Sequence, residues 1–148
     1  MCDYSLHHLA TTPAKVGDKL VSTVFPATVT RGFCAVGAPG VAVCLPPGAE
    51  LAFDQDVLGD RVLGFFRRRK INARVARFRQ VNLSEPYAHH DALEFPDGKL
   101  LLVTQLAPGQ TATVLQLPAV PRPAKAEASK PEATTEAAPT PFRARARL

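Results

Sequence analysis

The residues best suited to chemistry in this sequence are the cations between positions 61 and 79. Arginine suits anion binding because its planar guanidinium stays charged and can hold two oxygens of a carboxylate or phosphate at once. Phenylalanines lie between these cations, as in proteins that stack bases beside a phosphate backbone. The run contains eight cations and no acid: Arg61, Arg67, Arg68, Arg69, Lys70, Arg74, Arg77 and Arg79. It predicts a surface that docks an anionic partner.

The charge outside this run has the opposite sign. The rest of residues 1–118 holds four cations and ten acids, so these acids could pair with the basic run within the chain or in a homo-oligomer. Three interpretations stay open: a protein partner or self-association, a nucleic acid, or a solvated face. We place an anionic protein surface slightly ahead of nucleic acid, and expect a non-catalytic binding protein without a cofactor. The expected contact residues are Arg67, Arg68, Arg69, Lys70, Arg74, Arg77 and Arg79.

A second group with chemical potential is the histidine pair that opens the segment "HHDALEFPDG". Imidazole is the commonest transition-metal ligand, and Asp91 or Glu94 could complete a mixed site. The segment loosely resembles the first metal motif of cupins, which implies a metal-dependent enzyme or a metal-binding protein that uses His89, His90 and Glu94. Cupins carry His-x-His, however, whereas adjacent histidines in a strand point to opposite faces. A transition-metal site is therefore the alternative hypothesis.

Strands and turns must position these residues, because residues 15–118 contain no long segment with a 3.6-residue apolar period. Their turn signals recur at the spacing of a small antiparallel β-barrel or sandwich. "PDG" (96–98) predicts one hairpin and "GAPG" (37–40) another. The basic run is expected to form a hairpin that turns at "KIN" (70–72), with a one-turn helix as the alternative. Most of the core is expected from Val21, Val24, Phe33, Val43, Leu45, Leu63, Phe65, Leu93, Phe95, Leu101, Val103, Leu115 and Leu117.

The last thirty residues differ in composition from the rest of the chain. Residues 119–148 contain nine Ala and five Pro, with Phe142 as their one aromatic residue. Such a stretch buries too little apolar area to offset the entropy lost on ordering. We therefore expect a β-rich domain over residues 1–118 and a disordered tail over residues 119–148.

Cysteine usage and hydropathy bear on the compartment. No stretch reaches the roughly 18 consecutive apolar residues that a membrane span needs. The first residues also lack the cationic and apolar regions of a signal peptide. The sequence has three cysteines, Cys2, Cys34 and Cys44. An odd number of cysteines makes a poor disulfide framework and favours reduced thiols. We expect a cytoplasmic protein without a membrane partner.

Several segments together resemble a set of short bacterial proteins to which no function is assigned. They include "MCDYSL" (1–6), "PAKVGDKLVST" (13–23), "VARFRQVN" (75–82) and "HHDALEFPDG" (89–98). The likeness spans residues 1–118 and stops at the tail, which supports that boundary and implies a bacterial, cytosolic setting. It implies no catalytic residue, ligand or partner.

Overall fold

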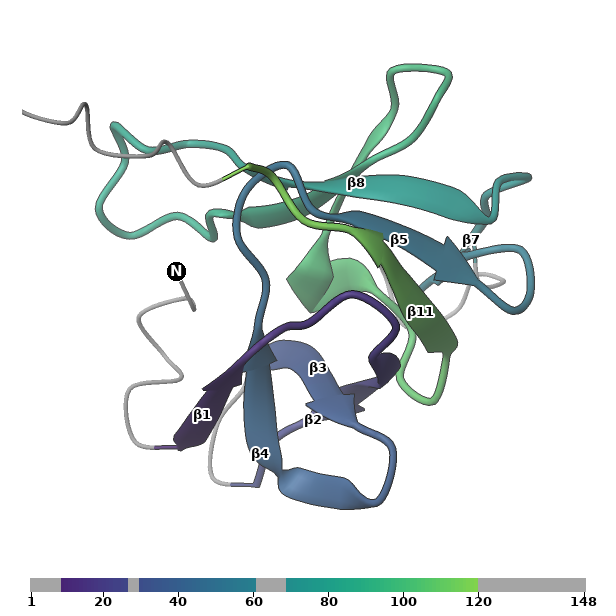
Figure 1. The fold of residues 1–148 in the computed structure, drawn as a ribbon. Coiled ribbons are helices and arrows are strands. Elements are labelled where there is room, and N and C mark those ends of the chain that lie inside the picture. Colours follow the sequence, from purple (N-terminus) through teal and green to yellow (C-terminus); the bar gives the residue numbers. More distant parts are fainter. Residues whose placement is uncertain (1–8, 27–29, 61–68, 120–148) are drawn as a thin grey trace, which may run out of the picture.

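The computed structural model describes residues 9–26, 30–60 and 69–119, and within these ranges the regular structure is almost entirely β (Figure 1). This confirms the all-β prediction. The predicted tail, apart from Ala119, lies outside the described residues. No helix in these ranges is long and apolar enough to cross a membrane. The elements are β1 (Ala10–Pro13), β2 (Lys19–Val24), β3 (Arg31–Ala35), β4 (Ala38–Cys44), β5 (Glu50–Phe53), β6 (Leu58–Gly59), β7 (Arg69–Lys70), β8 (Val75–Gln80), β9 (Asp91–Glu94), β10 (Leu100–Leu102), the 3-10 helix η2 (Val103–Gln105) and β11 (Thr111–Gln116).

Nine of the described strands form one sheet in the order β1-β4-β3-β2-β11-β5-β8-β9-β10. The sheet is open at β1 and β10, so it is not the closed barrel that was predicted, and one large sheet takes the place of a two-sheet sandwich. Nor is it purely antiparallel, because β1 pairs with β4 in parallel. β6 and β7 form a separate two-stranded sheet. Turn spacing indicates how many strands there are, but it carries no information on whether the end strands meet.

The hairpin predicted at "PDG" is confirmed. β9 and β10 pair in the register Glu94↔Leu100, and the Phe95 N–H donates to the Lys99 carbonyl at 2.9 Å. The Lys99 N–H donates to the Asp97 carboxylate at 3.1 Å, and Gly98 takes a φ of +79°. A side chain that bonds nearby backbone and a glycine at positive φ make this turn predictable from local sequence.

The hairpin predicted at "GAPG" forms, but its turn lies earlier in the chain. β3 and β4 are joined by a tight turn at Val36 and Gly37, with Gly37 at a φ of +88°. Ala38 already pairs with Ala35, so residues 38–40 extend β4 and do not form the turn. Glycine suits this position because it adopts positive φ without a steric penalty.

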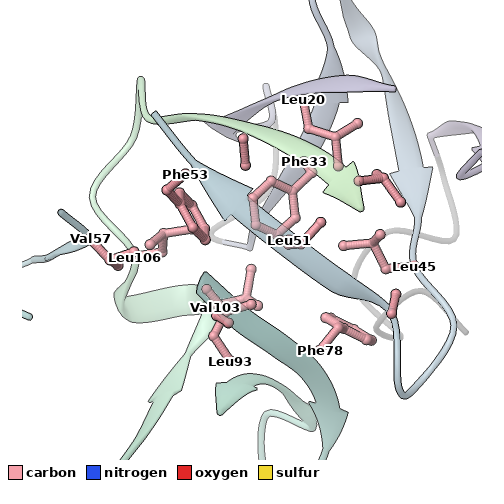
Figure 2. Packing of buried hydrophobic residues seen from close by; sticks show 14 of the residues in the cluster. Leu20, Phe33, Leu45, Leu51, Phe53, Val57, Phe78, Leu93, Val103 and Leu106 are labelled. Carbon is pink, nitrogen blue, oxygen red and sulfur yellow. The ribbon is translucent and has the colours of Figure 1, made fainter. Parts of the chain in front are cut away.

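One hydrophobic cluster draws side chains from both halves of the sheet. Leu20 and Phe33 come from β2 and β3, while Phe78 and Leu93 come from β8 and β9 (Figure 2). The rings of Phe33 and Phe53 lie 6.4 Å apart at a tilt of 53°, an arrangement that aromatic pairs favour. Strands from both halves share this cluster, so the sheet bends around its core.

The core prediction is confirmed in part. The buried members of the predicted set are Phe33, Val43, Leu45, Leu93, Phe95, Leu101 and Val103. Val21 and Leu117 are only partly buried, and Leu63 and Phe65 lie outside the described residues. The core prediction is wrong for Val24 and Leu115, which are 46% and 47% exposed. Val24 ends its strand, and the inward positions of β11 are Ala112 and Val114, so alternation turns Leu115 toward solvent.

The cysteines differ from the expected set of reduced thiols. Cys34 is a free, buried thiol, and burial raises its pKa above the usual value. Cys44 is disulfide-bonded, so the expectation of a reduced thiol is wrong for Cys44. The cytoplasmic compartment stays a prediction.

The depth of the core makes an unfolding prediction. Leu51 of β5 is fully buried at the centre of the sheet, so Leu51→Ala should lower the free energy of unfolding by about 2–5 kcal/mol. Leu115→Ala on the neighbouring strand is the control and should cost less than about 1 kcal/mol. Urea unfolding measures both. Equal losses would show that β11 turns Leu115 inward and would overturn its register.

Candidate binding surface

The side chains of β8 alternate between the core and the surface. Ala76 and Phe78 are buried, whereas Val75, Arg77 and Arg79 point outward. Backbone hydrogen bonds at 2.7 Å fix this register: the Phe78 N–H donates to the Ala49 carbonyl, and the Phe78 carbonyl accepts from the Gly48 N–H. The predicted strand in the basic run is therefore confirmed and the alternative helix is wrong.

The basic run does not fold as the one predicted hairpin, because its two described strands belong to different sheets. β7 pairs with β6, through Leu58↔Lys70 and Gly59↔Arg69. β8 pairs with β5 on one side and β9 on the other. Residues 71–74 therefore connect two sheets, and Lys70 of the predicted turn belongs to β7. β7 thus pairs with the strand before it, and β8 with the strand after it and with β5, so the two strands of the basic run do not pair with each other.

The outward arginines of β8 meet carboxylates from both neighbouring strands. Arg77 lies directly opposite Glu50 of β5 and Glu94 of β9. Arg77 Nη2 donates to Glu50 Oε1 at 2.6 Å, and Arg79 Nε donates to Glu94 Oε2 at 2.6 Å. The bond to Glu50 raises the pKa of Arg77 above its usual value. We call these four residues the charged row.

Each arginine of the charged row has donors to spare. Among the described residues, Arg77 uses only Nη2 and Arg79 only Nε in hydrogen bonds. With Nε engaged, Arg79 keeps its two terminal nitrogens, whose fork geometry matches the two oxygens of a carboxylate. Both side chains are about half exposed, at 49% and 45%. A ligand oxygen can therefore reach these guanidiniums while their own ion pairs stay in place.

A second cation cluster lies where β7 leads into β8. The Asp56 carboxylate forms ion pairs with Lys70 Nζ at 3.1 Å and with Arg74 Nε at 3.2 Å. The hydrogen bond from Lys70, followed by that from Arg74, lowers the pKa of the Asp56 carboxyl below its usual value. One carboxylate thus serves two cations, and this part of the surface keeps a positive excess. Arg69 is exposed beside them and makes no ion pair among the described residues.

A partly buried polar network holds β6, and hence β7, against the large sheet. The Gln110 amide behaves like a backbone peptide: its Oε1 accepts from the Leu58 N–H at 2.7 Å, and its Nε2 donates to the Leu58 carbonyl at 2.8 Å. The buried Ser22 hydroxyl donates to the Ala107 carbonyl at 2.8 Å and accepts from the Gln110 N–H at 2.9 Å. Buried polar groups satisfied in this way hold a single geometry.

A surface hollow of about 370 Å³ lies beside the charged row. The four charged residues line it together with Val75, Pro96 and Gly98. Its volume is at the small end of the range of roughly 300–1,000 Å³ for ligand sites. It therefore has room for a few side chains of a partner.

The predicted site residues do not all come together. Arg67 and Arg68 lie outside the described residues. His89 is exposed, His90 Nδ1 lies 3.0 Å from the Val81 carbonyl oxygen, and Glu94 is bonded to Arg79. Among the described residues no three His, Cys, Asp or Glu side chains form a group that could hold a metal. The metal interpretation gains no support from this geometry.

Comparisons of the chain with protein-family models, with curated proteins and with solved structures found no match. The function is therefore inferred from the surface itself. Two of its residues, Glu50 and Val75, were not singled out from the sequence as site residues. Glu50 meets Arg77 only through the register of β5 and β8, for which the local sequence gives no signal. Val75 shares the outward face of Arg77 because the two residues are two apart on β8.

The Asp56 cluster makes a titration prediction. The double variant Lys70→Met/Arg74→Met should raise the pKa of Asp56 toward its usual value, as followed by carboxyl-carbon NMR. A lowered folded-state pKa stabilises the fold above the unfolded-state pKa, and this contribution is lost as pH falls through the lowered value. The variant should therefore lose less stability on acidification. Asp97, whose own pKa is lowered by Lys99, is the internal control. An unchanged Asp56 titration would contradict the pairing.

Proposed function

We propose that this chain is a non-catalytic binding protein that docks an anionic partner through the cations of β7 and β8, an acidic protein ahead of a nucleic acid. The observation that carries this proposal is the outward pair Arg77 and Arg79, half exposed and with unused donors. Lys70, Arg74 and Arg69 form a second group of cations, before Arg77 in the chain, around Asp56. Arg67 and Arg68 belong to the predicted contact set but lie outside the described residues.

The carboxylates of the surface favour a protein over a nucleic acid. Four cations of the predicted contact set already face Glu50, Glu94 or Asp56. A phosphate backbone carries charge at every nucleotide and would meet these acids as well as the cations. A folded acidic protein can present a few carboxylates at chosen positions and avoid the acids. Such patterned charge contributes to specificity and association rate more than to raw affinity.

Exchange of ion pairs makes docking feasible. Ion pairs exposed to solvent contribute about 1 kcal/mol or less, and both partners in each pair of the charged row are partly exposed. A partner's carboxylate can therefore join or replace Glu50 or Glu94 at little cost. Salt should weaken the complex, because ions screen exposed charges.

The binding test uses labelled poly-glutamate, single-stranded RNA and duplex DNA, with fluorescence anisotropy measured across a salt series. The protein should bind poly-glutamate at about 0.15 M salt, and Arg77→Ala/Arg79→Ala should weaken this binding about tenfold or more, because charged hydrogen bonds are lost. Lys19→Ala removes one charge from β2 and serves as the control. Tighter binding of RNA or DNA would reverse the order of partners, and no binding of any polyanion would refute the proposal.

The carboxylates give a second test with the opposite sign. Glu50→Gln and Glu94→Gln remove intramolecular competitors for the arginines, so each should tighten poly-glutamate binding. An exposed ion pair contributes about 1 kcal/mol at most, which limits the gain to about fivefold per carboxylate. Glu85→Gln, in the exposed loop between β8 and β9, should change little. If both charged-row variants bind more weakly, their carboxylates position the arginines and do not compete with the partner.

A further inference from the structure

The hollow beside the charged row is lined by apolar and charged side chains, and those of β8 follow one another in a fixed order. Val75 is 42% exposed and faces the same side of β8 as Arg77 and Arg79. Because Arg77 pairs with Glu94, Val75 lies two residues further toward the turn that contains Pro96, and both line the hollow. An apolar contact and two arginines thus follow each other along one strand.

The spacing of these three side chains is that of an extended chain. Side chains on one face of a strand recur every second residue, roughly 6.6 Å apart. A partner segment laid along β8 in an extended conformation repeats with the same spacing. If an apolar side chain of the segment lies opposite Val75, the residues two and four positions further along the segment lie opposite Arg77 and Arg79.

The wall of the hollow is already ordered. The turn from Phe95 to Lys99 is closed by two backbone hydrogen bonds of 2.9 Å, Phe95 N–H to the Lys99 carbonyl and Gly98 N–H to the Phe95 carbonyl. Asp97 caps the Lys99 N–H at 3.1 Å. Binding therefore does not require this turn to become ordered, a cost that weakens many flexible sites.

From these observations we infer that the acidic partner docks through an extended segment that carries one apolar side chain and two acidic side chains at alternating positions. This inference rests on the proposed function and names the partner's recognition element. The apolar residue packs between Val75 and Pro96, and the carboxylates accept from the free nitrogens of Arg77 and Arg79. Arg79 engages its carboxylate with both terminal nitrogens, which a lysine cannot do.

The test compares labelled peptides of identical composition. Two alternating peptides carry a leucine and two glutamates separated by single serines; the glutamates follow the leucine in one peptide and precede it in the other. The shuffled peptide has the leucine and both glutamates adjacent. The full-length protein should bind an alternating peptide on the order of tenfold more tightly than the shuffled one, because apolar burial and paired hydrogen bonds are available together. Val75→Glu should abolish this difference, and Arg79→Lys should weaken the alternating peptide several-fold. Val36→Glu, an exposed valine in the β3–β4 turn, is the matched control.

The outcomes separate this inference from the proposed function. Equal binding of both peptides, lost in Arg77→Ala/Arg79→Ala, would retain anionic docking and overturn the spacing. A preference for the alternating peptide that survives Val75→Glu would overturn the assigned apolar contact. Failure of both peptides and of poly-glutamate to bind would overturn the inference together with the proposed function.

Discussion

The burial of Phe78 is the constraint on which the surface depends. A strand has a side-chain period of two, so moving β8 by one residue would bring its arginines into the core. Burying a large apolar side chain contributes about 1.5–3 kcal/mol, whereas an exposed ion pair contributes about 1 kcal/mol or less. The hydrophobic contact therefore sets the register, and the pairing of Arg77 with Glu50 and Glu94 follows from it. The charged row is a consequence of packing and did not have to stabilise the strand itself.

The strand β5 couples this surface to the rest of the protein. It pairs with β11 on one side and β8 on the other, and so joins the two halves of the large sheet. Its inward residues, Leu51 and Phe53, lie in the core, while Glu50 faces Arg77. The position of the Glu50 carboxylate is thus fixed by neighbours that are buried. A surface supported in this way presents its charges at defined distances.

Local signals in the sequence predicted the parts of the structure that depend on neighbouring residues. The β9–β10 turn followed from Asp97 and Gly98, and a strand in the basic run was expected as part of a hairpin in β-rich surroundings. Pairings between distant segments left no such signal. Nothing in the four residues of β5 indicates that this strand pairs with β11 on one side and β8 on the other.

The candidate surface shows the same division. Its cations were evident from composition, because they lie close together in the chain. Their acidic neighbours were not, since Glu50 is 27 residues from Arg77 in the sequence and meets it only through the β5–β8 register. The prediction of one basic hairpin failed for this reason: contiguous charge does not determine which strands pair.

The pairing of β2 with β11 has a consequence for how the chain folds. Lys19 lies opposite Thr113, so the two strands that complete the middle of the sheet come from opposite ends of the described domain. Closing so long a loop costs entropy before any contact is gained, and folds dominated by distant pairings reach the native state in milliseconds to seconds. The hairpins β2–β3 and β9–β10 join neighbouring segments and can form early. The step that unites them needs β11, so we expect sheet assembly, and not hairpin formation, to be the slow event.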